Sequence, residues 1–281
     1  KIAAANARRG GKAGTDMIRK GVILAAGCGA AVAAAFCLGV ALSSSGDTVL
    51  CTAQDLDTAV AACTAPERSD GEKVVYLTFD DGPSSTTELV LDILRDEGVP
   101  ATFFVTAAEC NEKYLPLLER ERDEGHAIGL HSCSHKYSTI YASPDAFWQD
   151  IDALKETLTA LGCPPDDLLR FPGGSTNTVS RKYGGSSIMK TLREQALEKG
   201  YRYVDWNVCA EDAAGEHLSA RSVYENIVKG AEGHNECIVL MHDTKATKTT
   251  AQALPDVIAW FRAAGYRFAA LDEMPPDDGN T

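Results

Sequence analysis

Two short segments of the chain carry side chains that could perform metal-assisted chemistry. The first, Thr78–Pro83, reads TFDDGP, and the second, His131–His135, reads HSCSH. Each segment follows an apolar stretch that predicts a strand. Side chains four positions apart lie on the same face of a helical turn, so we expect His131 and His135 to reach one cation together.

The adjacent carboxylates of Asp80 and Asp81 complete this hypothesis. One can serve as a hard oxygen ligand, and the other can accept a proton. A site with two histidines and one carboxylate leaves coordination positions for water and substrate, as hydrolysis requires. Each motif alone has a plainer explanation, since DDG often forms a turn and spaced histidines are often exposed. Taken together after two predicted strands, they indicate a hydrolytic metal site.

The N-terminal region predicts membrane attachment. Residues 21–42 contain no charged side chain, and this length is enough for a helix to span a bilayer. Basic side chains dominate residues 1–20, which places this tail in the cytoplasm. We therefore expect a cytoplasmic tail at 1–20, a transmembrane signal anchor at 21–42, a stalk at 43–72 and an extracellular domain at 73–281. The alternative is secretion after cleavage near Ala41–Ser43.

The charge of the chain restricts its partners. The formal net charge is −13 although the N-terminal tail is basic, so the remainder is strongly acidic. Such a domain is not expected to bind nucleic acid through the phosphate backbone. The acidity suits a neutral or cationic substrate, or simply solubility. We expect a monomer, and the pairing of the nine cysteines stays open.

From Lys73 onward, predicted strands and amphipathic helices alternate, which favours parallel strands joined by crossover helices. The expected strands are Lys73–Phe79, Ala101–Val105, Ala127–Leu130, Leu168–Phe171, Tyr201–Asp205, Cys237–Met241 and Tyr266–Leu271. The expected helices are Thr87–Glu97, Glu112–Glu124, Pro144–Leu161, Ile188–Lys199, Ala220–Gly230 and Thr250–Ala264. Between them, Asn177–Ser187 is expected to be a mobile surface insertion.

Polar side chains follow five of the predicted strands at their carboxyl ends. They are Asp80/Asp81, His131/His135, Arg170, Asp205 and His242. In a parallel α/β barrel this is the face at which active sites form. In contrast, Asp150 and Asp152 are expected to lie on a polar helix face without a functional role.

With these segments in this order, the chain resembles the polysaccharide deacetylases of the NodB-homology type, carbohydrate esterase family 4, over Lys73–Asp272. The segments that carry the resemblance are Thr78–Pro83, Gly125–His135, Arg170–Gly173, Asp205–Trp206 and Leu240–His242. The resemblance implies an α/β fold, a distorted β/α barrel.

The resemblance also implies a role for each matched residue. Asp80 would be the catalytic base, held by Arg170. The metal ligands would be Asp81, His131 and His135. The backbone N–H of Gly173, after Pro172, would stabilise the oxyanion. His242 would be the general acid, with a pKa raised by Asp205. Trp206 and Leu240 would form the pocket for the acetyl methyl group and the sugar face.

The expected activity is metal-dependent removal of N-acetyl groups from a cell-wall or surface polysaccharide, most simply the N-acetylglucosamine of peptidoglycan. Zn²⁺ suits the ligand set, with Co²⁺ or Mn²⁺ as alternatives. The rival hypotheses are an O-acetyl esterase acting on a xylan-like polymer and a non-catalytic carbohydrate-binding protein. The chain departs from the family at Gly173, where an aromatic residue is common, and this predicts that a wall of the sugar groove is lost.

Overall fold

The computed structural model describes residues 71–214 and 218–275 of the chain. The predicted tail at 1–20, the anchor at 21–42 and the stalk up to residue 70 lie outside the described residues and stay predictions. Within the described ranges, no helix combines the length and the apolar character that a bilayer-spanning segment needs.

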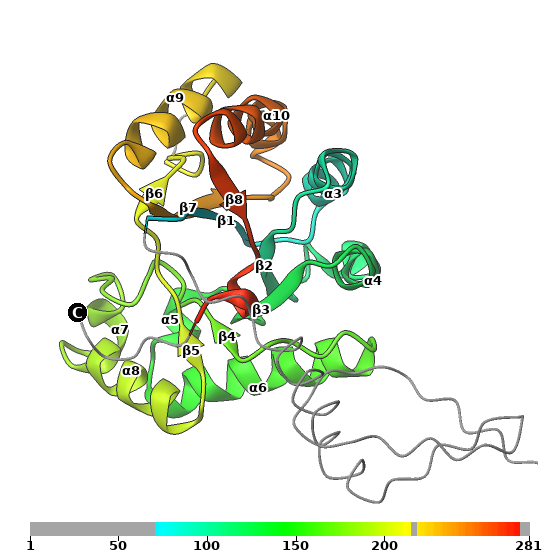
Figure 1. Ribbon diagram of the computed structural model, residues 1–281. Helices are drawn as coiled ribbons and strands as arrows, with labels where there is room; N and C mark the ends of the chain where they lie inside the picture. The colour runs from blue at the N-terminus through cyan, green and yellow to red at the C-terminus, as the bar shows by residue number, and fades with distance from the viewer. Residues whose placement is uncertain (1–70, 215–217, 276–281) are drawn as a thin grey trace, which may run out of the picture. The chain divides into compact units, whose positions relative to one another are not determined.

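The described residues form one curled, all-parallel sheet with helices around it (Figure 1). The strands are β1 (Lys73–Asp80), β2 (Thr102–Thr106), β3 (Ala127–Ser132), β4 (Leu168–Leu169), β5 (Arg202–Tyr203), β6 (Val208–Cys209), β7 (Glu236–His242) and β8 (Tyr266–Phe268). Their order is β5-β4-β3-β2-β1-β7-β6. β8 pairs with the first residues of β1, whereas β2 pairs with the last ones. The predicted α/β class with parallel strands is confirmed, as a curled half-barrel.

The connecting segments are helical. The longer helices are α3 (Ser85–Glu97), α4 (Leu117–Asp123), α6 (Pro144–Ala160), α8 (Ile188–Glu198), α9 (Ala220–Ala231) and α10 (Lys248–Ala263). The shorter ones are η2 (Glu112–Tyr114), α5 (Tyr137–Ile140), α7 (Arg181–Gly184) and η3 (Leu271–Glu273). Local signals account for their ends. Helix α3 begins with a capping box at Ser84 and stops at Gly98, which takes the left-handed conformation that glycine tolerates.

The alternation of side chains along β1 separates two apolar clusters. Val75, Leu77 and Phe79 belong to the large core between the sheet and the helices. Val74 and Tyr76 belong to a smaller cluster inside the curl of the sheet. Because successive side chains of a strand point to opposite faces, each strand contributes one row to each cluster. All five side chains are at most 1% exposed, and burying each contributes about 1.5–3 kcal/mol to folding.

The inward rows end on polar side chains at the carboxyl edge of the sheet. Asp80 lies two residues beyond Thr78 and four beyond Tyr76, so it continues the inward row of β1. The other inward rows end on His131 in β3, Arg170 after β4 and His242 in β7. The register pairs Asp80 directly with His242 across β1 and β7. Strand alternation therefore positions the predicted site inside the mouth of the curl.

Several expectations about local structure are wrong. His131 and His135 do not share a helical turn, because His131 belongs to β3 and His135 lies in the bend after it. The predicted helix Glu112–Glu124 is divided into η2 and α4 around Pro116. Part of the expected mobile insertion is helix α7, whose Gly184 packs tightly against the carbonyl of Tyr141.

Gly129 in β3 tests the packing that supports the site. A Cβ at this position would lie 2.6 Å from two ring carbons of Phe104 in the neighbouring strand. We expect Gly129→Ala to lower the free energy of unfolding by about 1–3 kcal/mol through overpacking. Chemical denaturation of the full chain measures the change. Leu89→Ala, on the exposed face of α3, is the control and should shift stability by less than about 0.5 kcal/mol. Equal stability of both variants would contradict this packing.

Candidate active site

Three predicted metal ligands converge at the carboxyl ends of β1 and β3. The Nε2 atoms of His131 and His135 lie 3.3 Å and 3.1 Å from Oδ1 of Asp81. One ligand atom from each residue lies within 4.8 Å of the others. The Nδ1–H of His131 donates to the carbonyl of Arg170 at 2.7 Å, which leaves Nε2 as the atom that faces the cluster.

The electrostatics of Asp81 fit a metal ligand. Its Oδ1 is buried and accepts no hydrogen bond. Burial opposes ionisation, but the interactions with His131 and then His135 outweigh it and hold the pKa of Asp81 well below its ordinary value. An ionised, buried carboxylate oxygen facing two imidazole nitrogens is a donor set that suits a divalent metal such as Zn²⁺. The residues of this chain therefore fit the metal that the family resemblance implies.

Two of these ligands have backbone conformations that non-glycine residues rarely adopt. The φ angle is 72° at Asp81 and 51° at His135. Such conformations persist where surrounding contacts hold them. The amide of Asn111 donates to the carbonyl of Asp81 at 2.7 Å, and the N–H of His135 donates to Oγ of Ser132 at 2.8 Å. These bonds fix the direction in which both ligands point.

Asp150 on α6 holds the bend between the two histidines. Its carboxylate accepts hydrogen bonds from Oγ of Ser132 at 2.6 Å, from N of Cys133 at 2.7 Å and from N of Ser134 at 3.0 Å. The expectation that Asp150 has no role is wrong. An acidic residue on a helix face gives no sequence signal for this contact, which depends on where α6 packs.

Arg170 and Asp80 form a buried ion pair. Nη1 of Arg170 lies 2.8 Å from Oδ1 of Asp80, and the two side chains are 0% and 5% exposed. The remaining donors of Arg170 reach Oγ1 of Thr78 at 2.6 Å and the carbonyls of Val204 and Asp205 at 2.9 Å and 3.1 Å. Every nitrogen of the guanidinium donates to at least one acceptor, so it keeps the Asp80 carboxylate in one orientation.

The partner of His242 is Asp212, and the expected pairing with Asp205 is wrong. Nδ1 of His242 lies 2.8 Å from Oδ1 of Asp212, while Oδ2 accepts from the backbone N–H of His242 at 2.8 Å and from Thr250 at 2.7 Å. Burial works against protonation, but Asp212 outweighs it and raises the pKa of His242 to about 9. Asp212 follows the two-residue strand β6, which is too short to predict from periodicity.

Asp205 instead positions the loop that follows β4. Its carboxylate accepts from the N–H of Ser175 at 2.8 Å and from the Ser175 hydroxyl at 2.6 Å. In the same loop, the carbonyl of Pro172 accepts from the hydroxyl of Tyr141 at 2.8 Å. These contacts fix the predicted oxyanion loop from both ends.

Gly173 lies at the turn of this loop, with φ of 78°. Its N–H donates to no acceptor in the described part of the chain. A Cβ on Gly173 would lie 2.7 Å from the hydroxyl of Tyr137, whose ring packs edge-on against His135. The hydroxyl of Tyr137, from helix α5, occupies the space that a side chain at 173 would need, and the expected loss of a groove wall stays a prediction. Tyr137 can occupy its position only because residue 173 has no side chain.

Leu240 and Trp206, which are predicted to contact the acetyl methyl group and the sugar, lie in different segments of the chain, β7 and the connection between β5 and β6. Leu240 is 5% exposed and precedes His242 by two residues on β7, so it shares the inward face. Trp206 is partly exposed and packs next to Gly174, with the guanidinium of Arg170 5.8 Å from its ring centroid. Both are positioned beside the catalytic groups.

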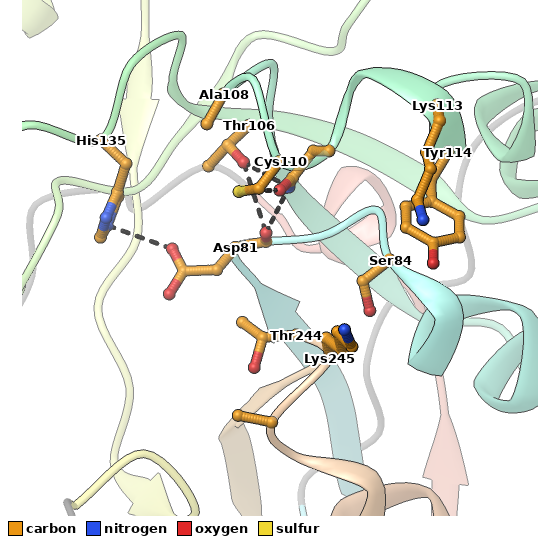
Figure 2. A pocket seen from close by; sticks show the side chains of 12 residues that line it. Asp81, Ser84, Thr106, Ala108, Cys110, Lys113, Tyr114, His135, Thr244 and Lys245 are labelled. Atoms are coloured by element: carbon orange, nitrogen blue, oxygen red, sulfur yellow. Dashed lines mark hydrogen bonds and ion pairs between the residues drawn. The ribbon is translucent and has the colours of Figure 1, made fainter.

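A pocket of about 460 Å³ opens beside the metal ligands (Figure 2). Asp81 and His135 form one wall. The other lining residues are Ser84, Thr106, Ala108, Cys110, Asn111, Lys113, Tyr114, Thr244, Lys245 and Ala246. The pocket therefore connects the metal-ligand cluster to η2 and to the segment after β7.

The buried side chain of Asp243 packs against Gly82 in the turn after β1. Its carboxylate accepts from Oγ1 of Thr87 and lies so close to Gly82 that any Cβ there would overlap it. Burial raises the pKa of Asp243 to about 7. The cysteines of the described residues carry no disulfide, and Cys133 is not part of the metal-ligand cluster.

Comparisons with known proteins agree with this site. A family model described as polysaccharide deacetylase matches residues 67–204. The putative polysaccharide deacetylase YheN of Bacillus subtilis is 31% identical over 207 residues, which are 72% of this chain and 68% of that protein. A peptidoglycan-N-acetylglucosamine deacetylase of Bacillus cereus is 29% identical, over 75% of this chain and 74% of that protein.

Solved structures give the same result. The catalytic domain of peptidoglycan N-acetylglucosamine deacetylase from Eubacterium rectale is 38% identical, with a TM-score of 0.69, covering 76% of this chain and 96% of that domain. The fold and the site define a hydrolase of the curled α/β type. The chain belongs to the polysaccharide deacetylases of the NodB-homology type, carbohydrate esterase family 4.

Removing the Asp150 carboxylate tests its hold on the metal ligands. We expect Asp150→Ala to weaken metal affinity about 10–100-fold, because the bend that orients His131 and His135 loses three acceptor contacts. Titration of the metal-stripped full chain with Zn²⁺ measures this. Asp152→Ala, an exposed acid on the same helix, is the matched control and should bind Zn²⁺ like the parent. Equal affinities in all three proteins would exclude this role.

The pH dependence of activity distinguishes the two candidate partners of His242. As a proton donor, His242 is competent below its pKa of about 9, so activity should fall as the pH rises through that value. Asp212→Asn removes the raising charge while burial remains. We expect the fall of activity at high pH to move toward or below the ordinary histidine pKa of about 6.5. Asp205→Asn should leave this fall near pH 9, and the reverse pattern would contradict the observed pairing.

Proposed function

We propose that this deacetylase removes N-acetyl groups from the N-acetylglucosamine of peptidoglycan in a metal-dependent reaction. The observation that carries the chemistry is the register of β1 and β7, which sets Asp80 opposite His242 at the mouth of the curl. Each has its own buried partner, Arg170 and Asp212. Binding a carbohydrate needs neither pair, so this arrangement opposes a non-catalytic role.

Three groups of the chain divide the reaction between them. Asp80, oriented by Arg170, accepts a proton from the attacking water. The N–H of Gly173 donates a hydrogen bond to the oxygen that becomes negative as the carbonyl carbon turns tetrahedral. His242, protonated near neutral pH because of Asp212, donates its proton to the departing amine. The C–N bond then breaks, with acetate and the free amine as products.

Asp81, His131 and His135 would hold the divalent metal, which supplies Lewis acidity toward the acetyl carbonyl and the attacking water. Zn²⁺ agrees best with two imidazoles and one carboxylate, and Co²⁺ or Mn²⁺ are alternatives. The bond from His131 to the carbonyl of Arg170 orders the tautomer in which Nε2 is free to coordinate. Metal affinity thus depends on the same strand ends that position the base.

The relatives support the choice of substrate. Several are named peptidoglycan-N-acetylglucosamine deacetylases, from Bacillus cereus and Listeria monocytogenes among others. A second candidate is suggested by the likeness to the Xyl-CE4 domain of a multidomain xylanase, 27% identical with a TM-score of 0.57. An O-acetyl ester on a xylan-like polymer is therefore the alternative substrate. Anchoring through residues 21–42, with the catalytic domain outside the cell, would bring the site to a wall polymer.

Acetate release by the full chain tests the activity. We expect release from peptidoglycan and from N-acetylglucosamine oligomers, loss of release after chelation, and recovery with Zn²⁺ or Co²⁺. Asp80→Asn should keep metal binding but lower kcat by about 10²–10⁴-fold, the usual contribution of a positioned base. Release from acetylxylan alone would overturn the substrate, and near-parental kcat in Asp80→Asn would overturn the assignment of the base.

A further inference from the structure

The pocket beside the metal ligands has a charge opposite to that of the chain as a whole. Its lining includes two lysines, Lys113 from η2 and Lys245 from the segment between β7 and α10. Its only acidic lining residue is Asp81, which belongs to the metal-ligand cluster. Two acids close to Lys113 in the sequence, Glu112 in η2 and Glu109 before it, do not line the pocket.

The two ammonium groups are available to a ligand. Neither Lys113 nor Lys245 forms an ion pair with any described residue, although both lie in a protein with a net charge of −13. Both lysines are exposed residues that line the pocket. An anionic ligand in this pocket would supply the two lysines with the counter-charge that no described ion pair provides.

Both lysines act on Tyr114. The ammonium of Lys113 is 4.6 Å from its ring centroid. Lys113 lowers the pKa of the Tyr114 hydroxyl most, Ser85 lowers it next, and the charge of Lys245 adds a smaller contribution. Figure 2 shows Lys113 and Tyr114 along the side of the pocket opposite His135, with Lys245 and Ser84 between them and the metal ligands. The two lysines therefore act on the same part of the pocket although they come from distant parts of the sequence.

Hydrogen bonds fix the position of the pocket relative to the metal ligands. Asn111, which lines it, donates to the carbonyl of Asp81 at 2.7 Å and to Oγ1 of Thr106 at 2.7 Å. On the opposite side, Oγ of Ser84 donates to the carbonyl of Asp243, immediately before Thr244 and Lys245. A group bound between the lysines would thus be fixed relative to the metal ligands.

We propose that Lys113 and Lys245 form a subsite for a carboxylate carried by the glycan, on a substituent next to the acetamide that is hydrolysed. This inference rests on the proposed function and narrows its substrate to a carboxylate-bearing polysaccharide such as peptidoglycan with its peptide substituents. The neutral or cationic substrate suggested by the overall charge does not describe this pocket. Charge pairing at a subsite favours the correct register of a repeating polymer over its neighbours.

Matched substrates test the subsite on the metal-loaded full chain. We would compare a soluble peptidoglycan fragment with the same fragment after its carboxylates are converted to amides. For the parent enzyme we expect KM to be about tenfold lower for the carboxylate form, with similar kcat and with a preference that shrinks as salt is added. In the double variant Lys113→Gln/Lys245→Gln the ratio of the two KM values should approach one.

Lys182→Gln is the control for this experiment. Lys182 is also an exposed lysine with its ammonium over the ring of the next residue, Tyr183, at 5.4 Å, but it does not line the pocket. It should keep the parental KM ratio. A ratio of one in the parent enzyme, or an unchanged ratio in the double variant, would overturn the subsite.

Binding measurements separate this inference from the proposed function. In the Asp80→Asn background, the dissociation constants of the two fragments can be measured without turnover. If no acetate is released from any substrate, the proposed function fails. Tighter binding of the carboxylate form, lost in the double lysine variant, would still support the subsite. Equal binding of both forms by the parent and by the double variant would overturn it in that case as well.

Discussion

The buried guanidinium of Arg170 is the constraint on which the site depends. A charged group with no exposure is stable only where its donors find acceptors, and here these come from β1 and from the two residues that follow β5. The ring of Phe104, 4.2 Å from the guanidinium carbon, closes the remaining face. Satisfying this one side chain requires the strands to be curled toward each other, which is also what brings Asp80 to the metal ligands.

The second feature of the site is that each of the two proton-transfer groups has a charged partner of its own. Asp80 is paired with a permanent cation, and His242 with an anion. Because each group has its own buried partner, the base and the acid are oriented by separate contacts. The metal-ligand cluster lies at the ends of β1 and β3, and His131 links it to the base pair through the carbonyl of Arg170 and through Asp80, 4.0 Å from its Nε2.

Much of this site could be predicted from the sequence because strand alternation is local. The polar residue at the end of each apolar run is visible in the chain, and Asp80, His131, Arg170 and His242 all lie where that reading places them. The supporting contacts could not be predicted in the same way. Asp212 follows a strand of two residues, and Asp150 is reached only when α6 packs on the bend after β3. The family resemblance assigns to Asp205 the role that the structure gives to Asp212, whose position depends on the pairing of β6 with β7.

The contact between Tyr137 and Gly173 has a consequence for how sequences of this kind can change. Each residue occupies volume that the other would need, so a side chain at 173 requires the phenol to leave, and its departure would open the space beside His135. Substitutions at the two positions are therefore expected to be non-additive. A side chain can occupy this space from either of two elements, α5 or the loop after β4, but not from both at once. Related chains that differ here would represent two alternative solutions to one steric problem, reachable from each other only by coupled substitutions.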